Sequence, residues 1–365
     1  MFDIDFKKYD YALMVTIAIA VVFGAMMVFS SSVIMADVRW SSPYMFFLKQ
    51  MIWVAIGFVA MGITAFFIDY KFYRKHAKAI YIITLAAVIA VLIFGVTRGG
   101  AKRWFNFHFA MFQPSELAKI AMVIIIADFI ERKKDLIAEW KGLIAPLVFL
   151  ILMVIPIAVE PDLGAPVLIA GVCLTMLFCA GIRIQAVLAA AGTGALLMIE
   201  EIIRKPYRIA RMRDYFDSII NIDAASYQVK QSLYALGSGG FFGKGLGKSE
   251  MKLMYLPEAH TDFIFPVIGE ELGFIGASAV IAFFMYVFFK GINISKNAPD
   301  KFAQNLSLGI TFLIVFQALI NISVATGIFP AKGLPLPFIS FGGTSLVINM
   351  AAAGILINLS KYKKA

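Results

Sequence analysis

The hydrophobic residues of this chain are grouped into long, nearly uncharged segments that short polar stretches separate. The segment from Leu13 to Ala36 contains no charged residue, and it is longer than the roughly 20 residues that a helix needs to cross the hydrocarbon core of a bilayer. The pattern predicts an all-α integral membrane protein of about ten transmembrane helices in a single polytopic domain, residues 1–365. Its apolar segments lie near 11–36, 46–68, 79–96, 115–130, 143–159, 163–181, 184–200, 263–289, 304–327 and 340–359.

Composition supports this class and excludes an ordinary soluble domain. Hydrophobic residues make up 61% of the chain and charged residues 15%, whereas soluble domains average about 45–50% and 25%. Cys173 and Cys179 lie six residues apart in one apolar segment. They would point to different faces of one helix, so no disulfide bridge is expected between them.

The basic residues predict an orientation in the membrane. When both termini are placed in the cytoplasm, every inside loop carries lysine or arginine, as the positive-inside rule requires. The sixth and seventh apolar segments are separated only by a short turn containing Arg183, and we count them as two spans.

The segment of about 201–262 is expected to be a long extracytoplasmic loop between spans 7 and 8, and it is strongly basic. Loops of this length are largely exempt from the orientation rule. One interpretation is contact with anionic lipid headgroups through IIRKPYRIARMRDYF, whose aromatic and basic residues suit a membrane interface. The other is that the outer face handles a polyanionic, phosphate-bearing substrate. The loop TRGGAKRWFNFHFAMFQ adds Arg98, Lys102 and Arg103 to the same side.

Several motifs in the loops do not support a function. In SGGFFGKGLGKS, Phe242 occupies the position of the first glycine of a P-loop, and no strand precedes it. The glycines of this stretch are better explained by tight backbone turns. The three histidines lie in different loops and do not form a zinc site. No nucleic-acid partner is expected.

Ionisable residues at membrane depth are costly and are therefore functional candidates. Glu116 and Lys119, in QPSELAK, lie three residues apart and share one helical face. They form either a structural ion pair or a site in which the carboxylate holds the ammonium toward a phosphate. Glu160 and Asp162, in VEPDLGAP, lie at an outer helix end and are either residues of a solvated turn or site residues.

A third group of acids surrounds the start of the eighth span, in YLPEAHTDFIFPVIGEE. Asp262 lies where the basic loop meets the span. Low dielectric and basic neighbours would act on its pKa in opposite directions, which is the situation of a general base. The alternative is an N-cap for the helix. On a helix, Glu270 lies about 80° from Asp262 and Glu271 about 180°. We therefore expect Glu270 to line the same cavity and Glu271 to form packing or interhelical hydrogen-bond contacts.

Taken together, the motifs resemble the SEDS family (shape, elongation, division and sporulation proteins), over nearly the whole chain. The matching stretches are GAKRWFNFHFAMFQPSELAK, EPDLGAPVL, YQVKQSLYALGSGGFFGKGLGKS, YLPEAHTDFIFPVIGEELGFIG and GIFPAKGLPLPFISFGGTSL. The wording of PAKGLPLPF and YLPEAHTDFIF is more similar to the FtsW division branch than to the RodA branch. Ala165 and Phe341 depart from the family's usual threonine and tyrosine.

The resemblance implies a peptidoglycan glycosyltransferase that polymerises lipid II at the outer surface of the bacterial cytoplasmic membrane. The family's essential loop aspartate falls on Asp262. The substrate-binding set that we assign comprises Arg103, Gln113, Glu116, Lys119, Asp162, Gln228 and Glu270.

This role agrees with the chemistry of a lipid diphosphate donor. Its leaving group needs no protonation, so one base and cationic stabilisation suffice, unlike the two carboxylates of glycosidases. We expect Asp262 to deprotonate an acceptor hydroxyl and invert the linkage, and Arg103 and Lys119 to stabilise the pyrophosphate, with or without Mg²⁺ or Mn²⁺.

The expected partners are lipid II, the growing glycan strand, a class B penicillin-binding protein and other division or elongation membrane proteins. The alternatives are an elongation polymerase of the RodA type, a lipid II flippase and a non-catalytic division scaffold.

Overall fold

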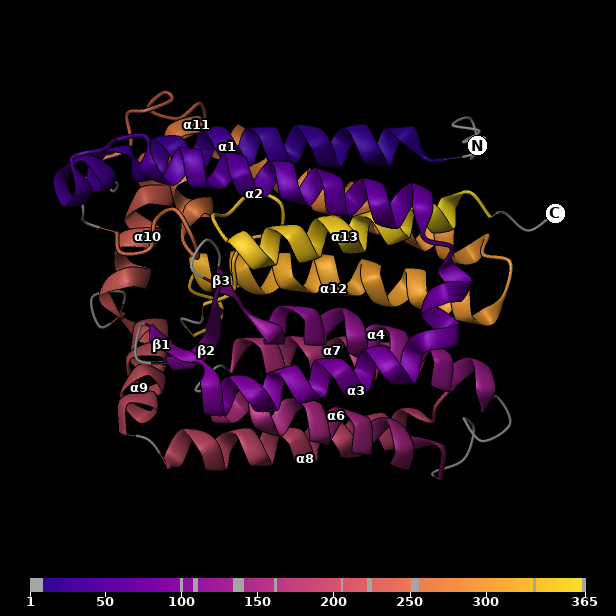
Figure 1. Ribbon diagram of the computed structural model, residues 1–365. Coiled ribbons are helices and arrows are strands. Elements are labelled where there is room, and N and C mark those ends of the chain that lie inside the picture. The colour runs from indigo at the N-terminus through magenta and orange to yellow at the C-terminus, as the bar shows by residue number, and fades with distance from the viewer. Residues whose placement is uncertain are drawn as a thin grey trace.

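The computed structural model describes residues 9–98, 101–107, 111–133, 141–160, 163–204, 206–221, 225–250, 256–330 and 333–362. Its long helices run roughly side by side and form one bundle (Figure 1). They are α1 (Tyr11–Trp40), α2 (Met45–Gly62), which a π-helical turn, Ile63–Phe67, extends, α3 (Tyr70–Phe94), α4 (Pro114–Arg132), α6 (Lys141–Val159), α7 (Gly164–Cys179), α8 (Ile184–Ile203), α11 (Ile264–Lys296), α12 (Lys301–Ala325) and α13 (Gly343–Ser360).

These ten helices coincide with the ten apolar segments, and the chain is an integral membrane protein. Within the described residues, eight of the helices are long and apolar enough to cross a membrane. The two others differ for physical reasons: α7 has only 16 residues, and α4 carries several charged side chains, among them Glu116, Lys119 and Asp128. The count of ten spans therefore stays a prediction.

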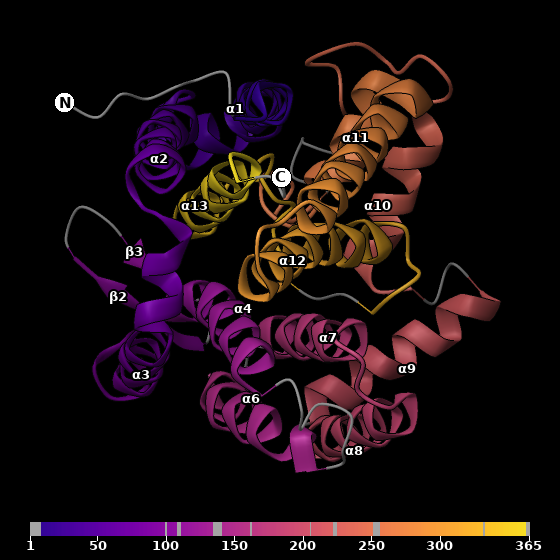
Figure 2. The ribbon, with the colours of Figure 1, turned by 90° about the vertical axis from the view of Figure 1, so that its right-hand side faces the viewer.

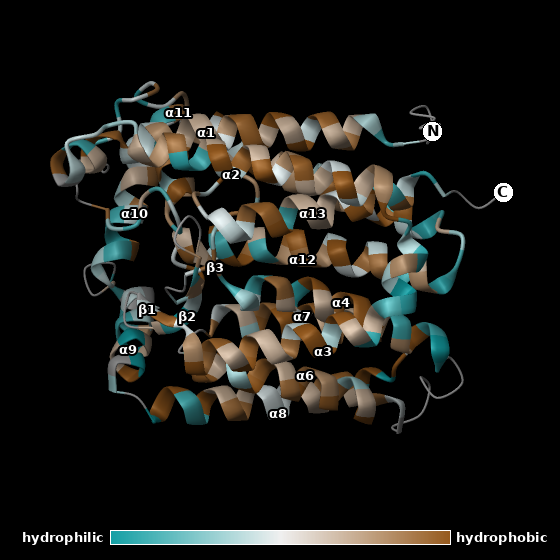
Figure 3. Cartoon of the chain, in the orientation of Figure 1, coloured by the Kyte–Doolittle hydropathy of each residue, from teal (hydrophilic) through white to brown (hydrophobic). Residues whose placement is uncertain are grey.

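The helices differ in how much of their surface the bundle covers. α12 and α13 lie at its centre, next to α4 (Figure 2). The most apolar stretches of these two helices are 67% and 78% buried. In contrast, 11% of α8 is buried, and large apolar side chains such as Leu188, Leu196 and Ile203 are exposed on it. Because hydropathy is high on the outer helices as well as within (Figure 3), the surface of the bundle suits a lipid environment.

The chain is mostly helical, as the predicted all-α fold requires, and one small sheet departs from that prediction. Between α3 and α4, β1 (Val96–Arg98), β2 (Ala101–Asn106) and β3 (Met111–Phe112) form a small antiparallel sheet in the order β1-β2-β3. The sheet extends beyond the ends of the neighbouring long helices (Figure 1). A search for apolar segments of helical length cannot detect strands of two to six residues, and their backbone groups pair with one another instead of continuing a helix.

The two ends of the bundle differ. At one end the start of α1 meets the end of α13, where the Asp10 amide donates to Ser360 Oγ at 2.9 Å and Lys290 Nζ contacts Asp10 Oδ2 at 2.8 Å. At the other end, which we call the loop end, lie the sheet, α9 (Pro206–Ile220) and α10 (Tyr227–Ser238) (Figure 1). α9 and α10 belong to the expected loop of 201–262, and α9 runs across the direction of the long helices.

Candidate functional site

Asp262 lies at the loop end, in the turn that leads into α11. The N-cap of α11 is Phe263, whose side chain makes no capping hydrogen bond, so the alternative of Asp262 as the N-cap was wrong. Asp262 is partly exposed, and its backbone carbonyl accepts a hydrogen bond from Asn321 Nδ2 at 2.8 Å. A polar side chain in the interior of the bundle therefore holds the main chain of this residue, while the residue keeps access to the surface.

The segment that precedes α13 runs directly beside Asp262. Ser340 Oγ donates to the carbonyl of Thr261, and the Phe341 amide donates to the carbonyl of His260 at 2.9 Å. A Cβ atom at Gly333 would lie 2.8 Å from Asp262 Oδ2, so a larger residue would crowd the carboxylate. Two motif stretches that lie about seventy residues apart in the sequence thus meet at this carboxylate.

Two buried amide side chains on α12 join these segments. Asn321 Nδ2 donates to the carbonyls of both Asp262 and Leu334, at 2.8 and 2.7 Å. One helical turn away, Gln317 Nε2 donates to the carbonyl of Pro335 at 2.8 Å. Sequence reasoning missed both amides. The signal that could have revealed them is a pair of amides at i, i+4 in an otherwise apolar span, since uncompensated polar groups there are costly.

Glu116 and Lys119 lie in the first turns of α4 and are connected to these amides through Gln317. Their ion pair joins Lys119 Nζ and Glu116 Oε2 at 2.7 Å, and the side chains are 1% and 6% exposed. Lys119 Nζ also donates to Gln317 Oε1 at 2.8 Å. The shared helical face is confirmed. Because the ammonium is engaged by two partners and buried, the structural alternative fits this geometry better than a direct phosphate contact.

We expected Glu270 to line the same cavity as Asp262, but the structure buries it beneath a loop. Its side chain is 0% exposed, and its carboxylate accepts hydrogen bonds from Lys244 Nζ at 2.9 Å, from Ser249 Oγ and from the amide of Glu250 at 3.0 Å. The helical angle suggested a cavity-facing position, but a loop folded back against the helix covers it. Glu271 accepts an interhelical hydrogen bond from Ser30 Oγ of α1 at 2.7 Å, so that prediction is confirmed.

The remaining candidates lie on the elements that lead into α4 and α7. Arg103 is partly buried in the middle of β2. Gln113 is the N-cap of α4 and is 8% exposed, and its carbonyl accepts from the amide of Glu116 at 3.1 Å. The Glu160 side chain is 1% exposed, so a solvated turn does not describe it. Asp162 lies outside the described residues.

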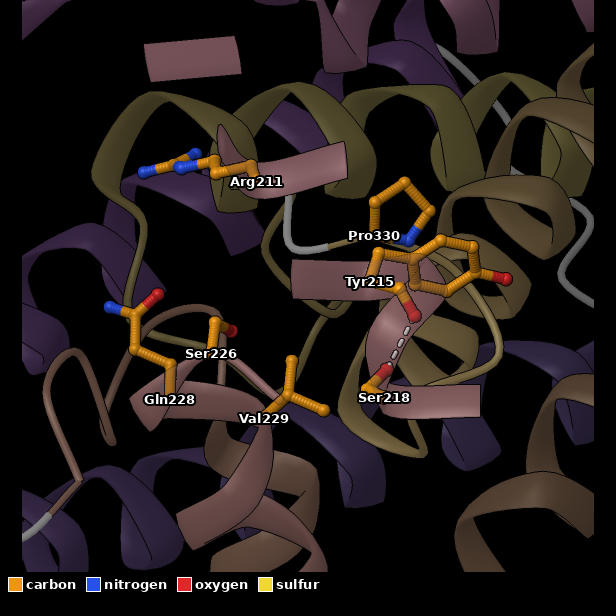
Figure 4. A pocket seen from close by; sticks show the side chains of 7 residues that line it. All are labelled: Arg211, Tyr215, Ser218, Ser226, Gln228, Val229 and Pro330. Atoms are coloured by element: carbon orange, nitrogen blue, oxygen red, sulfur yellow. Dashed lines mark hydrogen bonds between the residues drawn. The ribbon is translucent and has the colours of Figure 1, made fainter. Parts of the chain in front are cut away.

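Gln228 lines a pocket between α9 and α10 (Figure 4). Val229 and Pro330 supply apolar surface there, and Arg211 supplies a guanidinium group. Tyr215 fixes this region to the end of α12, because its hydroxyl donates to the carbonyl of Ile328 at 2.6 Å. The pocket is separate from the contacts that hold Asp262. Its full lining is Arg211, Tyr215, Ser218, Ser226, Gln228, Val229 and Pro330.

Two observations describe the charge of the loop end. Arg211 and Arg213 of α9 are exposed and give this end a positive surface. The hydrogen bond to the Glu270 carboxylate raises the pKa of Lys244 above its usual value of 10.5, so Lys244 is charged at neutral pH.

Within the described ranges, no group of three or more His, Cys, Asp or Glu side chains is arranged to hold a metal ion.

Comparisons with known proteins agree on one family. The family FTSW_RODA_SPOVE, described as cell cycle protein, matches residues 11–365. The "Probable peptidoglycan glycosyltransferase FtsW" of Trichlorobacter lovleyi is 38% identical over 97% of this chain and 93% of its own length. The "Stage V sporulation protein E" of Bacillus subtilis is 36% identical over 97% of this chain and 98% of its own.

Solved structures show the same fold. The rod shape determining protein RodA of Thermus thermophilus superposes with a TM-score of 0.74 at 22% identity, covering 98% of both chains. A chain described under "Structural coordination of polymerization and crosslinking by a peptidoglycan synthase complex" gives a TM-score of 0.80 at 22% identity, covering 98% of this chain and 99% of that one. With its helical bundle, its motifs and relatives of nearly full length, this chain belongs to the FtsW/RodA/SpoVE family.

Proposed function

We propose that this chain is a peptidoglycan glycosyltransferase that polymerises lipid II into β-1,4 glycan strands for the septal cell wall, with Asp262 as its general base. The observation that carries the proposal is the placement of Asp262. Its main chain is fixed by Asn321, its carboxylate lies beside Gly333, and the residue is partly exposed at the loop end. The names of the relatives support the reaction class.

The reaction begins when the Asp262 carboxylate takes the proton of the C4 hydroxyl of an incoming lipid II sugar. The oxygen attacks the anomeric carbon of the growing strand from the face opposite the lipid diphosphate. The bond to the diphosphate breaks, the α-linkage becomes β, and the electron pair leaves with undecaprenyl pyrophosphate. Because a diphosphate is a good leaving group, no general acid is required on that side.

The charge that develops on the diphosphate needs cations in reach of the outer surface. We assign this task to Arg103 on β2, with Arg211 of the pocket in Figure 4 as a second cation. Lys119 is withdrawn from this task because it is 1% exposed and paired with Glu116. Any Mg²⁺ or Mn²⁺ would be bound mainly by the diphosphate oxygens, since carboxylate and phosphate oxygens are the ligands that Mg²⁺ prefers.

The proposal includes ten spans in the bacterial cytoplasmic membrane, cytoplasmic termini and an extracytoplasmic loop end. The contact between Asp10 and Ser360 supports it, because an even number of crossings returns the chain to the side on which it began. Lys71, Arg74 and Lys78 near the start of α3 fit a cytoplasmic surface. A membrane-impermeant thiol reagent should label an Asp262→Cys variant from outside intact cells. Labelling only after permeabilisation would overturn this orientation.

The proposed partner is a class B penicillin-binding protein, a transpeptidase that crosslinks the strands. The described peptidoglycan synthase complex, which coordinates polymerisation with crosslinking, supports this choice. The division role follows the relatives named FtsW. Depletion should therefore give filamentous cells, whereas round cells would point to elongation.

Polymerisation of lipid II by the purified protein with its transpeptidase tests the reaction. Asp262→Asn should lower the rate at least about 100-fold, the usual loss for a general base. Glu258→Gln is the matched control, since Glu258 is an exposed acid in the same turn whose Oε2 accepts from Thr261 at 2.9 Å. Full activity of Asp262→Asn would remove Asp262 from the mechanism. Liposomes in which labelled lipid II crosses without being lengthened would indicate a flippase.

A further inference from the structure

α11 is interrupted within its 33 residues. Gly273 has φ 67° and ψ −163°, which is not a helical conformation. The interruption separates a short helix, 264–272, from the longer remainder, and Asp262 stands just before the short part. Such a break leaves carbonyl and amide groups of the helix ladder without their usual partners, which is unfavourable in a membrane interior unless other groups replace those partners.

The backbone of the glycine-rich loop supplies the missing partners. We call residues 239–250 the glycine clasp. The amides of Lys244 and Gly245 donate to the carbonyls of Glu270 and Glu271, at 2.9 and 3.0 Å. After the break, the amide of Phe274 donates to the carbonyl of Gly240 at 2.9 Å, and the next amide donates to the carbonyl of Phe241 at 3.3 Å. The clasp therefore joins both sides of the interruption.

Side chains lock the clasp to the short helix. The buried Glu270 carboxylate accepts from Lys244 Nζ at 2.9 Å, from Ser249 Oγ and from the amide of Glu250. Glu271 is also 0% exposed, and it accepts from Ser30 Oγ of α1 and from the amide of Ser249 at 3.4 Å. Glu270 thus holds the clasp against the short helix, and Glu271 contacts the clasp and also connects the short helix to α1.

The glycines of the clasp are required by close contact with α11. A Cβ atom at Gly239 would overlap the carbonyl oxygen of Gly269, and one at Gly243 would overlap that of Glu271. Gly243 also has φ +81°, which favours glycine. The clasp is consequently fitted to the short helix at the level of the backbone, and Lys244 directs its ammonium to Glu270 and Glu250.

We propose that Lys244 and Glu270 are positioning residues for Asp262: by locking the clasp onto the interrupted helix, they fix where the carboxylate meets its substrate. This inference rests on the proposed function of Asp262. The short helix is held by the clasp on one side, and Asn321 holds the Asp262 carbonyl on the other. Release of the clasp removes the restraint on the short helix, so the carboxylate loses its alignment while the surfaces that bind substrate stay in place.

Steady-state polymerisation by the full-length protein with its transpeptidase tests the role of the pair. Lys244→Met should lower kcat about 10- to 100-fold, as misplacement of a reacting group by about 1 Å does, with less than a twofold change in KM. Lys244→Arg should restore most of kcat, because it keeps the charge that Glu270 accepts. Lys248→Met is the matched control, an exposed lysine of the same loop, and should behave as wild type.

A second variant and a second measurement keep the test decisive. If Lys244→Met does not fold, Glu270→Gln is the second test. It removes the charge at nearly constant volume and should lower kcat in the same way. In a protein carrying Cys173→Ala and Cys179→Ala, the thiol labelling rate of Asp262→Cys should change severalfold when Lys244→Met is added. This labelling requires no catalysis, so it still tests the clasp if wild-type protein makes no polymer and the proposed function fails.

Three results would overturn the inference. A raised KM with unchanged kcat would make Lys244 a substrate contact. Wild-type kcat in both Lys244→Met and Glu270→Gln would show that the pair does not position the base. An unchanged labelling rate of Asp262→Cys in the Lys244→Met background would show that the turn before α11 stays in place without the locked clasp.

Discussion

Two lysine–carboxylate pairs stabilise the bundle, and they are built in opposite ways. Glu116 and Lys119 are three residues apart on α4, and both side chains are almost fully buried. Lys244 and Glu270 are 26 residues apart, and the lysine is 27% exposed while the acid is 0% exposed. The first pair belongs to one helix and reaches its surroundings through Gln317. The second pair connects a loop to an interrupted helix.

The difference lies in what each pair holds together. Helix geometry brings Glu116 and Lys119 together wherever α4 is formed. Lys244 and Glu270 meet only when the clasp is docked, and the same docking satisfies the backbone at the break in α11. We therefore expect the first pair to be replaceable as a unit and the second to be irreplaceable. The following variants test this contrast, from the largest expected effect to the smallest.

Gly243→Ala should disrupt the docking itself. The added methyl group would overlap the carbonyl of Glu271 at a positive φ, and we expect a loss of about 2–5 kcal/mol from strain and overpacking. Gly237→Ala is the control, because that position is in α10 with open space around it and alanine favours helix by about 1 kcal/mol. Thermal unfolding in detergent should rank Gly243→Ala far below both wild type and Gly237→Ala. Equal melting temperatures would contradict the clasp geometry.

The two pairs should differ in a double-mutant comparison. Lys119→Met leaves a buried carboxylate without its cation and should cost about 3–5 kcal/mol, and adding Glu116→Leu should recover most of this loss. The part that is not recovered comes from Gln317 Oε1, which loses its donor. The combination of Lys244→Met with Glu270→Leu should not recover, because it also leaves Ser249 and the Glu250 amide without their acceptor. Apparent melting temperatures of the single and double variants measure, for each pair, how much of the loss from the lysine substitution the second substitution recovers. Similar recovery in both pairs would remove the distinction.

The hydrogen bond from Asn321 to the Asp262 carbonyl restrains Asp262 independently of the clasp, and a substitution of Asn321 removes it. Asn321→Leu keeps the branching and the number of side-chain heavy atoms but leaves the carbonyls of Asp262 and Leu334 without their donor, which should cost about 1–3 kcal/mol. We expect kcat to fall about 10-fold while KM changes little. Asn297→Leu, at the far end of α11 and exposed, is the control. A polymerisation rate equal to wild type in Asn321→Leu would show that Asn321 is not needed to position the base.

The smallest effect is a dependence on alkaline pH. The folded pKa of Lys244 lies above 10.5 because of its hydrogen bond to Glu270. A raised lysine pKa contributes stability that is fully present below the unfolded pKa and is lost as pH rises through the folded value. The difference in melting temperature between wild type and Lys244→Met should therefore be constant from pH 7 to about 10 and should narrow above that. A difference that narrows already between pH 7 and 9 would contradict the assignment.

The sequence by itself determined the features that depend on local pattern. Apolar segments of helical length marked the positions of the long helices, because a bilayer selects for that length. The spacing of Glu116 and Lys119 indicated their shared face, and the resemblance of the motifs identified the family. The sequence also indicated that loop and helix meet at Asp262, although the alternative of Asp262 as the N-cap of the helix was wrong.

The tertiary structure decided which distant residues meet. Asn321 and Asp262 are 59 residues apart, and Lys119 and Gln317 are 198 apart, so helical periodicity carries no information about either contact. The burial of Glu270 depends on a loop whose glycines fit a break at Gly273, and neither the break nor the docking has a periodic signal. Hydrophobic pattern specifies which segments enter the membrane. The partners of buried polar groups follow only from packing, because each such group must be satisfied by whatever side chain or backbone the fold brings to it.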